Sequence, residues 1–107
     1  MSIADKKQKS EVVHYLIESA WQLGRIRMSS TAHANHRAEQ RAIDVLDLRE
    51  VILYGVREEN QDSWKEDWGH WVYAIRNRNV DGRDIRVIFD VEGYPDVVVV
   101  TLMHVYA

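Results

Sequence analysis

Apolar and polar side chains near the start of the chain follow the spacing of an amphipathic helix. After Ser10, apolar residues recur every three or four positions, which predicts a helix with Ser10 as N-cap that ends near Leu23, before Gly24. Residues 25–29 alternate instead, so a short strand is expected to follow. The helical positions expected to face the core are Val13, Leu16, Ile17 and Ala20.

Residues 31–43 predict a second helix, which Ser30 or Thr31 is placed to cap. Side chains four positions apart drift by only about 40° around a helix, so they share one edge. One edge of this helix carries cationic side chains, and the edge next to it carries small ones. We expect the edge with small side chains to be buried, because alanine allows a helix to pack close to its neighbour. The cationic edge is His33, Arg37 and Arg41, and the small edge is Ala34, Ala38 and Ala42.

A third helix is predicted to follow directly and to reach Tyr54. Either Asp44 or Asp47 is placed to cap its first turn, because a short carboxylate accepts from free backbone N–H groups there. Gly55 is placed to end it. The apolar side of this helix is formed by Leu48, Val51 and Ile52.

After residue 55 the pattern changes to a period of two, which is typical of strands. Asp81-Gly82 is a hairpin signal, Gly93 to Asp96 is a second turn, and the acidic residues 60–67 predict a loop. The run from Val97 to Met103 lacks polar alternation, so we expect a central strand covered on both faces. The predicted strands are Val56–Glu59, Trp71–Arg78, Asp84–Val91 and Asp96–Tyr106.

Helices followed by strands predict an α+β fold, in which N-terminal helices pack on an antiparallel β-meander. We expect a single domain over residues 1–107, with residues 1–9 frayed and residues 10–24 forming a helix additional to a core of residues 25–107. A hydrophobic content of 46% and a charged content of 29% suit such a domain.

The absence of cysteine excludes disulfides, thiol catalysis and cysteine-ligated zinc. Lysines at positions 6, 7 and 9 interrupt any apolar segment of a signal peptide, and the longest apolar run is too short to cross a bilayer. We therefore expect a cytoplasmic protein without a cofactor and without a membrane partner.

Charge is distributed unevenly along the chain, whose net charge is −3. Residues 25–41 carry four arginines and two histidines against Glu39, and residues 76–86 carry four arginines against two aspartates. The acidic side chains gather between residues 44 and 67. Two basic stretches that meet in space would bind an anion despite the overall acidity.

One sequence motif begins at His33, continues with arginines four and eight residues later, and ends with an isoleucine two residues further on. Two dipeptides follow it, one shortly after the motif and one in the last predicted strand. The residues are His33, Arg37, Arg41, Ile43, Asp47-Leu48 and Val100-Thr101. This pattern resembles a family of small bacterial domains of unknown function. That family is similar to the RelE/ParE superfamily of toxin–antitoxin ribonucleases and gyrase poisons, and to BrnT-type toxins. The resemblance runs from about Ser29 to Val105, with Ala42 where the family usually has glycine. It implies a RelE-like core and raises RNA cleavage as a hypothesis.

Metal-independent RNA cleavage needs an acid and a base, together with cations around the phosphate. Histidine titrates near neutrality, and arginine donates two parallel hydrogen bonds to phosphate. We therefore predict that His33 acts as acid or base and that Arg41 and Arg86 hold the phosphate. Further candidates are Arg37, Arg76, Thr101 and His104, of which Thr101 matches the terminal threonine of the family.

Each candidate also has a structural interpretation. Arg37 and Arg41 can pair with nearby carboxylates, and an arginine-rich hairpin is commonly just solvated. His33 and His36 are spaced as a metal pair, but Glu39 is the one carboxylate at a matching position and a site needs three or four ligands, so no metal site is predicted. His14 is expected to be structural, and four aromatic residues are expected to pack rather than to bind bases: Trp64, Trp68, Trp71 and Tyr73.

Two functional hypotheses follow. The first is a RelE-like toxin or endoribonuclease-type RNA-binding protein, with RNA as substrate and an antitoxin protein as partner. The second is a non-catalytic binding or assembly module, such as a homodimer joined through the last strand or the tryptophans. The motif favours the first, whereas the negative net charge and the scarcity of lysine after residue 9 favour the second.

Overall fold

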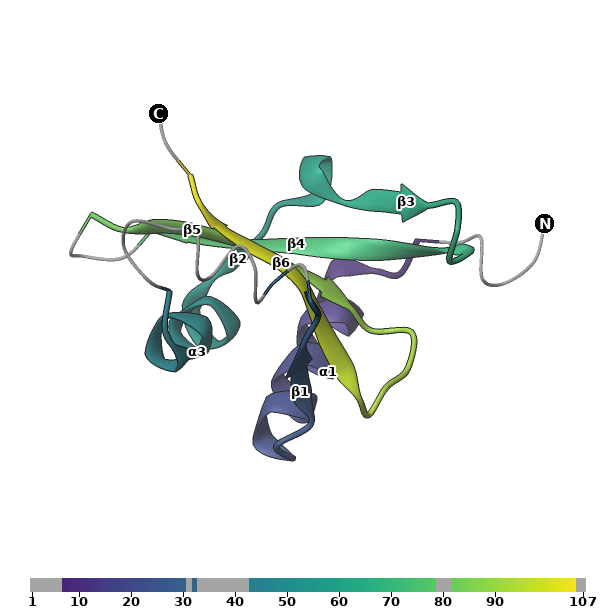
Figure 1. Cartoon of the computed structure of the whole chain (residues 1–107), viewed down its shortest axis with the longest axis horizontal. Helices are drawn as coiled ribbons and strands as arrows, with labels where there is room; N and C mark the ends of the chain where they lie inside the picture. Colours follow the sequence, from purple (N-terminus) through teal and green to yellow (C-terminus); the bar gives the residue numbers. More distant parts are fainter. Residues whose placement is uncertain (1–6, 31, 33–42, 79–81, 106–107) are drawn as a thin grey trace.

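The computed structural model describes residues 7–30, 32, 43–78 and 82–105. In this part of the chain, α1 and α3 lie on the same side of a six-stranded sheet (Figure 1). The sheet has the order β1-β6-β5-β4-β2, and β3 pairs with β4 as well. The elements are α1 (Ser10–Gln22), β1 (Ile26–Met28), α3 (Val45–Tyr54), β2 (Val56–Arg57), the 3-10 helix η2 (Glu59–Gln61), β3 (Ser63–Lys65), β4 (His70–Arg78), β5 (Asp84–Asp90) and β6 (Val97–His104).

The α+β class is confirmed, but the sheet as a whole is not the antiparallel meander that was predicted. β4, β5 and β6 do follow one another as antiparallel neighbours. However, β1 adds to the far side of β6 in the parallel direction, with Ile26 opposite Val97 and Met28 opposite Val99. The sheet is therefore mixed. A three-residue strand gives too weak a pattern to show the direction of its pairing.

The first helix matches its predicted range and its buried face, but not its cap. Val13, Ile17 and Ala20 are fully buried, and Leu16 packs against the same core. Lys9 occupies the N-cap position, while the hydroxyl of Ser10 donates instead to Glu59 Oε1 at 2.6 Å. The helix ends before Gly24, whose φ of 68° is a conformation that favours glycine.

α3 begins with a reciprocal capping box. Asp44 accepts a hydrogen bond from the backbone N–H of Asp47, and the Asp47 side chain accepts one from the backbone N–H of Asp44, each at 3.0 Å. The helix ends at Gly55, as predicted. A Cβ at Gly55 would collide with the Val51 carbonyl and lie 2.5 Å from Ile75 Cγ2, so glycine lets β2 start tight against the sheet.

The predicted acidic loop contains structure that the sequence pattern did not reveal. β2 pairs with β4 through Arg57 opposite Ile75, and β3 pairs with the same strand through Ser63 opposite Val72. The intervening η2 interrupts what would otherwise be one continuous edge strand. The prediction that residues 60–67 form a loop was therefore wrong, because Trp64 and its neighbours pair with β4.

One hydrophobic core lies between the helices and the sheet. Alternate residues of β4, β5 and β6 point into it, including Ile75, Val87 and Phe89. β6 is central, between β5 and β1, as predicted. Its burial nevertheless alternates: Val97 and Val99 are buried and the residues between and beside them are half-buried. The expectation that both faces of this strand are fully covered was wrong.

Candidate functional site

The candidate site lies on the sheet face opposite to α1 and α3, on the side where η2 and β3 lie (Figure 1). Arg76 of β4 and Arg86 of β5 stand directly opposite each other in the strand register. Like charges at such positions repel, so this pair requires a counter-ion. Glu58, just after β2, provides it. Arg86 donates to Glu58 Oε1 at 2.5 Å and to Oε2 at 3.0 Å, and Arg76 donates to Oε2 at 3.2 Å.

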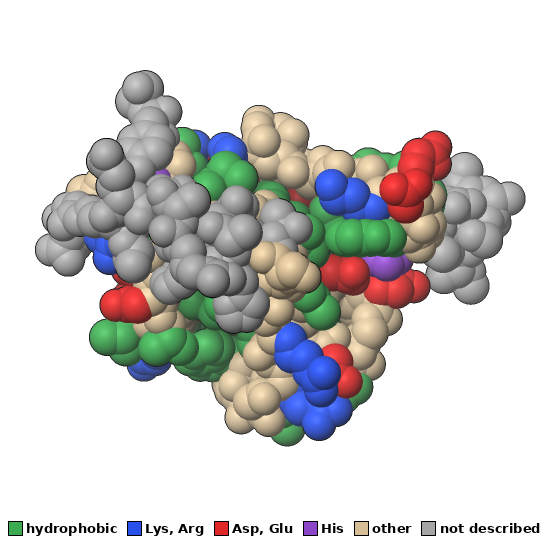
Figure 2. Space-filling view, in the orientation of Figure 1, with side chains coloured by type: hydrophobic (Ala, Val, Ile, Leu, Met, Phe, Trp, Pro, Cys, Tyr) green, Lys and Arg blue, Asp and Glu red, His purple; other side chains and the backbone are tan. Residues whose placement is uncertain are grey.

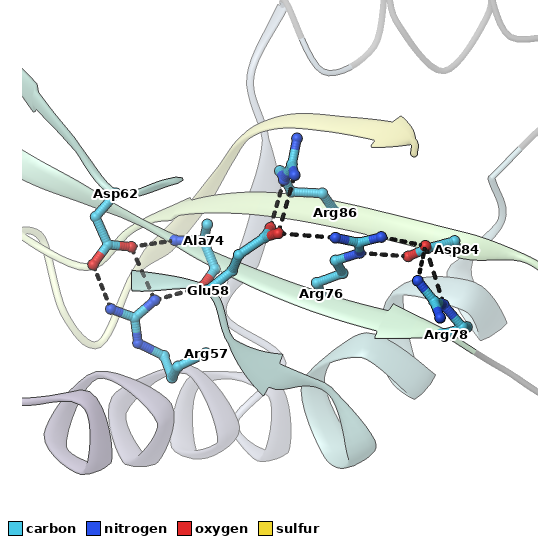
Figure 3. Close-up of polar contacts among 8 residues, drawn as sticks. All are labelled: Arg57, Glu58, Asp62, Ala74, Arg76, Arg78, Asp84 and Arg86. Carbon is cyan, nitrogen blue, oxygen red and sulfur yellow. Dashed lines mark hydrogen bonds and ion pairs between the residues drawn. The ribbon is translucent and has the colours of Figure 1, made fainter. Parts of the chain in front are cut away.

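Asp84 extends this arrangement along the same face (Figure 3). It accepts two hydrogen bonds from Arg76, at 2.8 and 2.6 Å, and two longer ones from Arg78, both at 3.3 Å. Arg78 keeps 73% of its side chain exposed, whereas Arg86 keeps 18%. We call these five residues the Glu58 network: Glu58, Arg76, Arg78, Asp84 and Arg86.

The charges in the Glu58 network hold one another ionised. Hydrogen bonds from Arg86, and then from Arg76, lower the pKa of Glu58 despite its burial. The pKa of Asp84 is lowered chiefly by its hydrogen bonds from Arg76. The same contacts raise the pKa of Arg76 and of Arg86. At neutral pH the network therefore contains three guanidinium cations and two carboxylates.

A second group of ion pairs lies nearby, around a carboxylate that is closed to solvent. Asp62, whose side chain is fully buried, accepts bidentate hydrogen bonds from Arg57 at 3.0 and 2.6 Å and one from the backbone N–H of Ala74 at 2.8 Å. Lys7 adds an ion pair at 2.9 Å. Burial raises the pKa of Asp62, but the hydrogen bonds from Arg57 and Ala74 outweigh it, so the pKa is lowered. We call these four residues the Asp62 cluster.

An open hollow of about 440 Å³ adjoins both groups. Tyr54 and Val56 line it from the end of α3 and the start of β2, and Asn77 lines it from β4. Its remaining lining is charged and comes from Arg57, Glu58, Arg76 and Arg78. We call it the Tyr54 hollow. It combines an exposed aromatic ring, a side-chain amide and cationic groups in one depression.

Two of the predicted catalytic residues lie on this face. Arg86 stands opposite Met103, and Ile88 stands opposite Thr101, so Arg86 and Thr101 share one face of the sheet on neighbouring strands. His104 stands opposite the buried Ile85 and therefore belongs to the other face. The remaining predicted catalytic residues, His33, Arg37 and Arg41, lie outside the described residues.

Sequence reasoning missed Glu58, although it found Arg76 and Arg86. Glu58 belongs to the predicted strand Val56–Glu59, directly before the predicted acidic loop, and no motif singled it out. The available signal was the hairpin itself: the predicted turn at Asp81-Gly82 already placed Arg76 near Arg86, and two facing arginines require an acid. Arg83, from the same hairpin, pairs with Asp47 at 2.8 and 2.9 Å.

His14 and the tryptophans Trp64 and Trp71 make packing contacts inside the protein, as predicted. His14 Nε2 lies 2.8 Å from the Ile52 carbonyl, which can only accept, so the ring donates there and links α1 to α3. Trp64 and Trp71 form an edge-to-face pair with ring centroids 6.1 Å apart, and Trp71 packs against the core. Trp68 is half exposed beside His70.

Comparisons with known proteins give a family but no activity. Searches of the curated proteins and of the solved structures found no match. No helix of the described residues is long and apolar enough to span a membrane, and these residues contain no group of three or more potential metal ligands. A family model described as Domain of unknown function (DUF4258) matches residues 30–104. Since this match covers most of the chain, the protein belongs to the DUF4258 family.

Proposed function

We propose that this protein binds single-stranded RNA on the open sheet face and cleaves it there, as an endoribonuclease-type protein with a RelE-like core. The observation that carries the proposal is the row of three guanidinium groups around Glu58 and Asp84. Three cations against two carboxylates leave a local positive charge on a chain whose net charge is −3.

A phosphodiester competes with Glu58 for the arginines. Guanidinium groups bind phosphate oxygens in the same bidentate geometry that Arg86 now makes with the Glu58 carboxylate. Arg78 is the most exposed cation of the network and would meet the phosphate first. When a phosphate takes over the arginines, the Glu58 carboxylate is released while it is still ionised.

Cleavage then follows as an internal transfer within the RNA. Glu58 accepts the proton of a ribose 2′-hydroxyl, whose oxygen attacks the adjacent phosphorus. The bond from phosphorus to the 5′ oxygen breaks, and that oxygen receives a proton from the imidazolium of His33. The products are a 2′,3′-cyclic phosphate and a free 5′-hydroxyl. Arg76 and Arg86 neutralise the charge that builds up on the phosphoryl oxygens.

The test measures binding and cleavage separately, using a short labelled single-stranded RNA. Arg86→Ala and Arg76→Ala are expected to weaken binding at least tenfold, and Arg27→Ala is the control. Arg27 lies at the other end of the sheet on β1 and, at 72% exposed, matches the exposure of Arg78. His33→Ala is expected to abolish cleavage and to keep binding. Wild-type protein that neither binds nor cleaves RNA would contradict the proposal.

A cellular test addresses the toxin interpretation. Expression is expected to arrest growth in a way that depends on His33 and Arg41, and a cognate antitoxin protein is expected to relieve the arrest. Growth that continues unchanged, with protein accumulating in folded form, would contradict a toxin. In that case RNA binding in vitro would still stand as an independent result.

A non-catalytic assembly module remains the second candidate, because apolar side chains reach the surface on the helices. Figure 2 shows hydrophobic side chains on the surface over α3, where Val45 and Leu46 are about two-thirds exposed. Such positions are where a homodimer or another partner would bury area. Sedimentation of the purified protein tests this, and a monomer at all concentrations would contradict the homodimer.

A further inference from the structure

We propose that the Tyr54 hollow binds one base of the RNA whose phosphate lies on the Glu58 network; this rests on the proposed function. The hollow and the network share Glu58, Arg76 and Arg78, so a ligand that occupies one necessarily approaches the other. A volume of about 440 Å³ falls within the range of small-ligand clefts, roughly 300–1,000 Å³.

Tyr54 supplies an aromatic surface for stacking. It is the last residue of α3, and 65% of the residue is exposed although it adjoins a strongly charged region. Val56, which also lines the hollow, is 72% exposed. Bases stack on exposed aromatic rings irrespective of sequence, because every base has a π-face.

Asn77 and the edge of β4 supply polar groups for the base. The pairing of β2 with β4 stops at Val56 opposite Arg76, before β4 ends at Arg78. The hollow therefore lies where β4 extends past its neighbour. A side-chain amide there offers both donors and an acceptor to the edge of a base.

The positions of the arginines determine the orientation in which a nucleotide would bind in the hollow. Arg57 is 7% exposed and is committed to Asp62, so it forms part of the wall rather than a phosphate ligand. Arg78 is largely exposed, and within the described part of the chain it is held by two long hydrogen bonds of 3.3 Å to Asp84. The phosphate thus belongs on the Arg78 and Arg76 side, and the base belongs against Tyr54.

The experiment compares a short single-stranded RNA with the same ribose–phosphate chain lacking its bases. Wild-type protein is expected to bind the RNA about tenfold more tightly than the abasic chain, as stacking of one base implies. Tyr54→Ala should remove this difference without changing the affinity for the abasic chain. Tyr54→Phe should keep the difference, because the ring remains.

Tyr15→Ala is the matched control, since Tyr15 lies on α1 and is 67% exposed. Arg78→Ala should weaken both ligands equally. Equal affinity of the wild type for the two ligands, or an unchanged preference in Tyr54→Ala, would overturn the base site while leaving RNA binding intact. Absence of binding to either ligand would overturn the proposed function and the base site together.

Discussion

The Asp62 cluster and the Glu58 network use the same pair of chemical groups in different surroundings. The Asp62 side chain is fully buried, and Arg57, Lys7 and the backbone N–H of Ala74 all direct hydrogen atoms or charge at it. Glu58 keeps 13% of its side chain exposed, and one of its two arginines is shared with Asp84. Both carboxylates have a lowered pKa.

The difference shows that a lowered pKa does not by itself mark a functional carboxylate. In the Asp62 cluster every partner comes from the protein and the group is shielded from water, so an external ligand has no route to it. In the Glu58 network the arginines face an open surface beside a hollow, so a phosphate can replace the carboxylate. We therefore predict that the first group serves stability, and the proposed function gives the second group the role of binding.

We expect the largest loss of stability when the carboxylate of the Asp62 cluster is removed. Asp62→Ala leaves the buried Arg57 without its carboxylate, which should lower the free energy of unfolding by about 3–5 kcal/mol. Denaturant unfolding measures this. Asp67→Ala is the control, because Asp67 belongs to the same acidic stretch and is exposed. If Asp62→Ala lowered the free energy of unfolding by less than about 1 kcal/mol, the Asp62 cluster would not have the stabilising role that distinguishes it from the Glu58 network.

Gly55→Ala should disturb both groups at once, because Gly55 sets the position of β2 and hence of Arg57 and Glu58. Its new Cβ would lie 2.5 Å from Ile75 Cγ2, so we expect a loss of about 2 kcal/mol in unfolding free energy together with weaker RNA binding. Gly93→Ala is the control, since a Cβ there meets its nearest atom at 3.4 Å. Equal stability of the two variants would contradict this account of Gly55.

The Glu58 network should show itself in the pH dependence of stability. A carboxylate whose pKa is lowered on folding stabilises the protein above its ordinary pKa of 4.5, and this contribution disappears as the pH falls below that value. Glu58→Gln should therefore cost about 1 kcal/mol at pH 7 and should flatten the fall in stability below pH 4.5. An unchanged acid profile would show that Glu58 is not held by the arginines in solution.

We expect Lys7→Ala to cause the smallest loss in the free energy of unfolding. Its ammonium group lies 2.9 Å from Asp62 and 5.2 Å from the centroid of the Trp71 ring, yet a third of the side chain is exposed. We expect a loss of about 0.5 kcal/mol, reduced further by salt. A loss comparable to that of Asp62→Ala would mean that Lys7, rather than Arg57, neutralises the buried carboxylate.

Local patterns in the sequence were sufficient to predict most of the helices and strands. The helical spacing from Val13 to Ala20 and the turn at Asp81-Gly82 each placed an element correctly. β3 escaped prediction because its three residues lie among charges, and their pairing depends on the long neighbouring strand β4. Pairing between distant segments leaves no local periodicity.

Predicting the site from the sequence was harder, since it depends on which charges meet. Arg86 was predicted to hold phosphate, but no local pattern indicated its partner Glu58, which lies 28 residues away. The cap at Ser10 failed for the same reason, because a distant acceptor, Glu59, takes its hydroxyl. The placement of His33, Arg37 and Arg41 stays a prediction, since these residues lie outside the described part of the chain.

The parallel pairing of β1 with β6 has a consequence for biosynthesis. β1 precedes the region matched by the family model, yet its partner residues, Val97 to Val99, lie 71 positions further along the chain than Ile26 to Met28. While the chain is being made on the ribosome, β1 has no partner strand on this side until the residues of β6 have emerged. This pairing therefore forms only after β6 has been made, and a nascent chain that stalls before residue 97 would expose Ile26 and Met28 to chaperones.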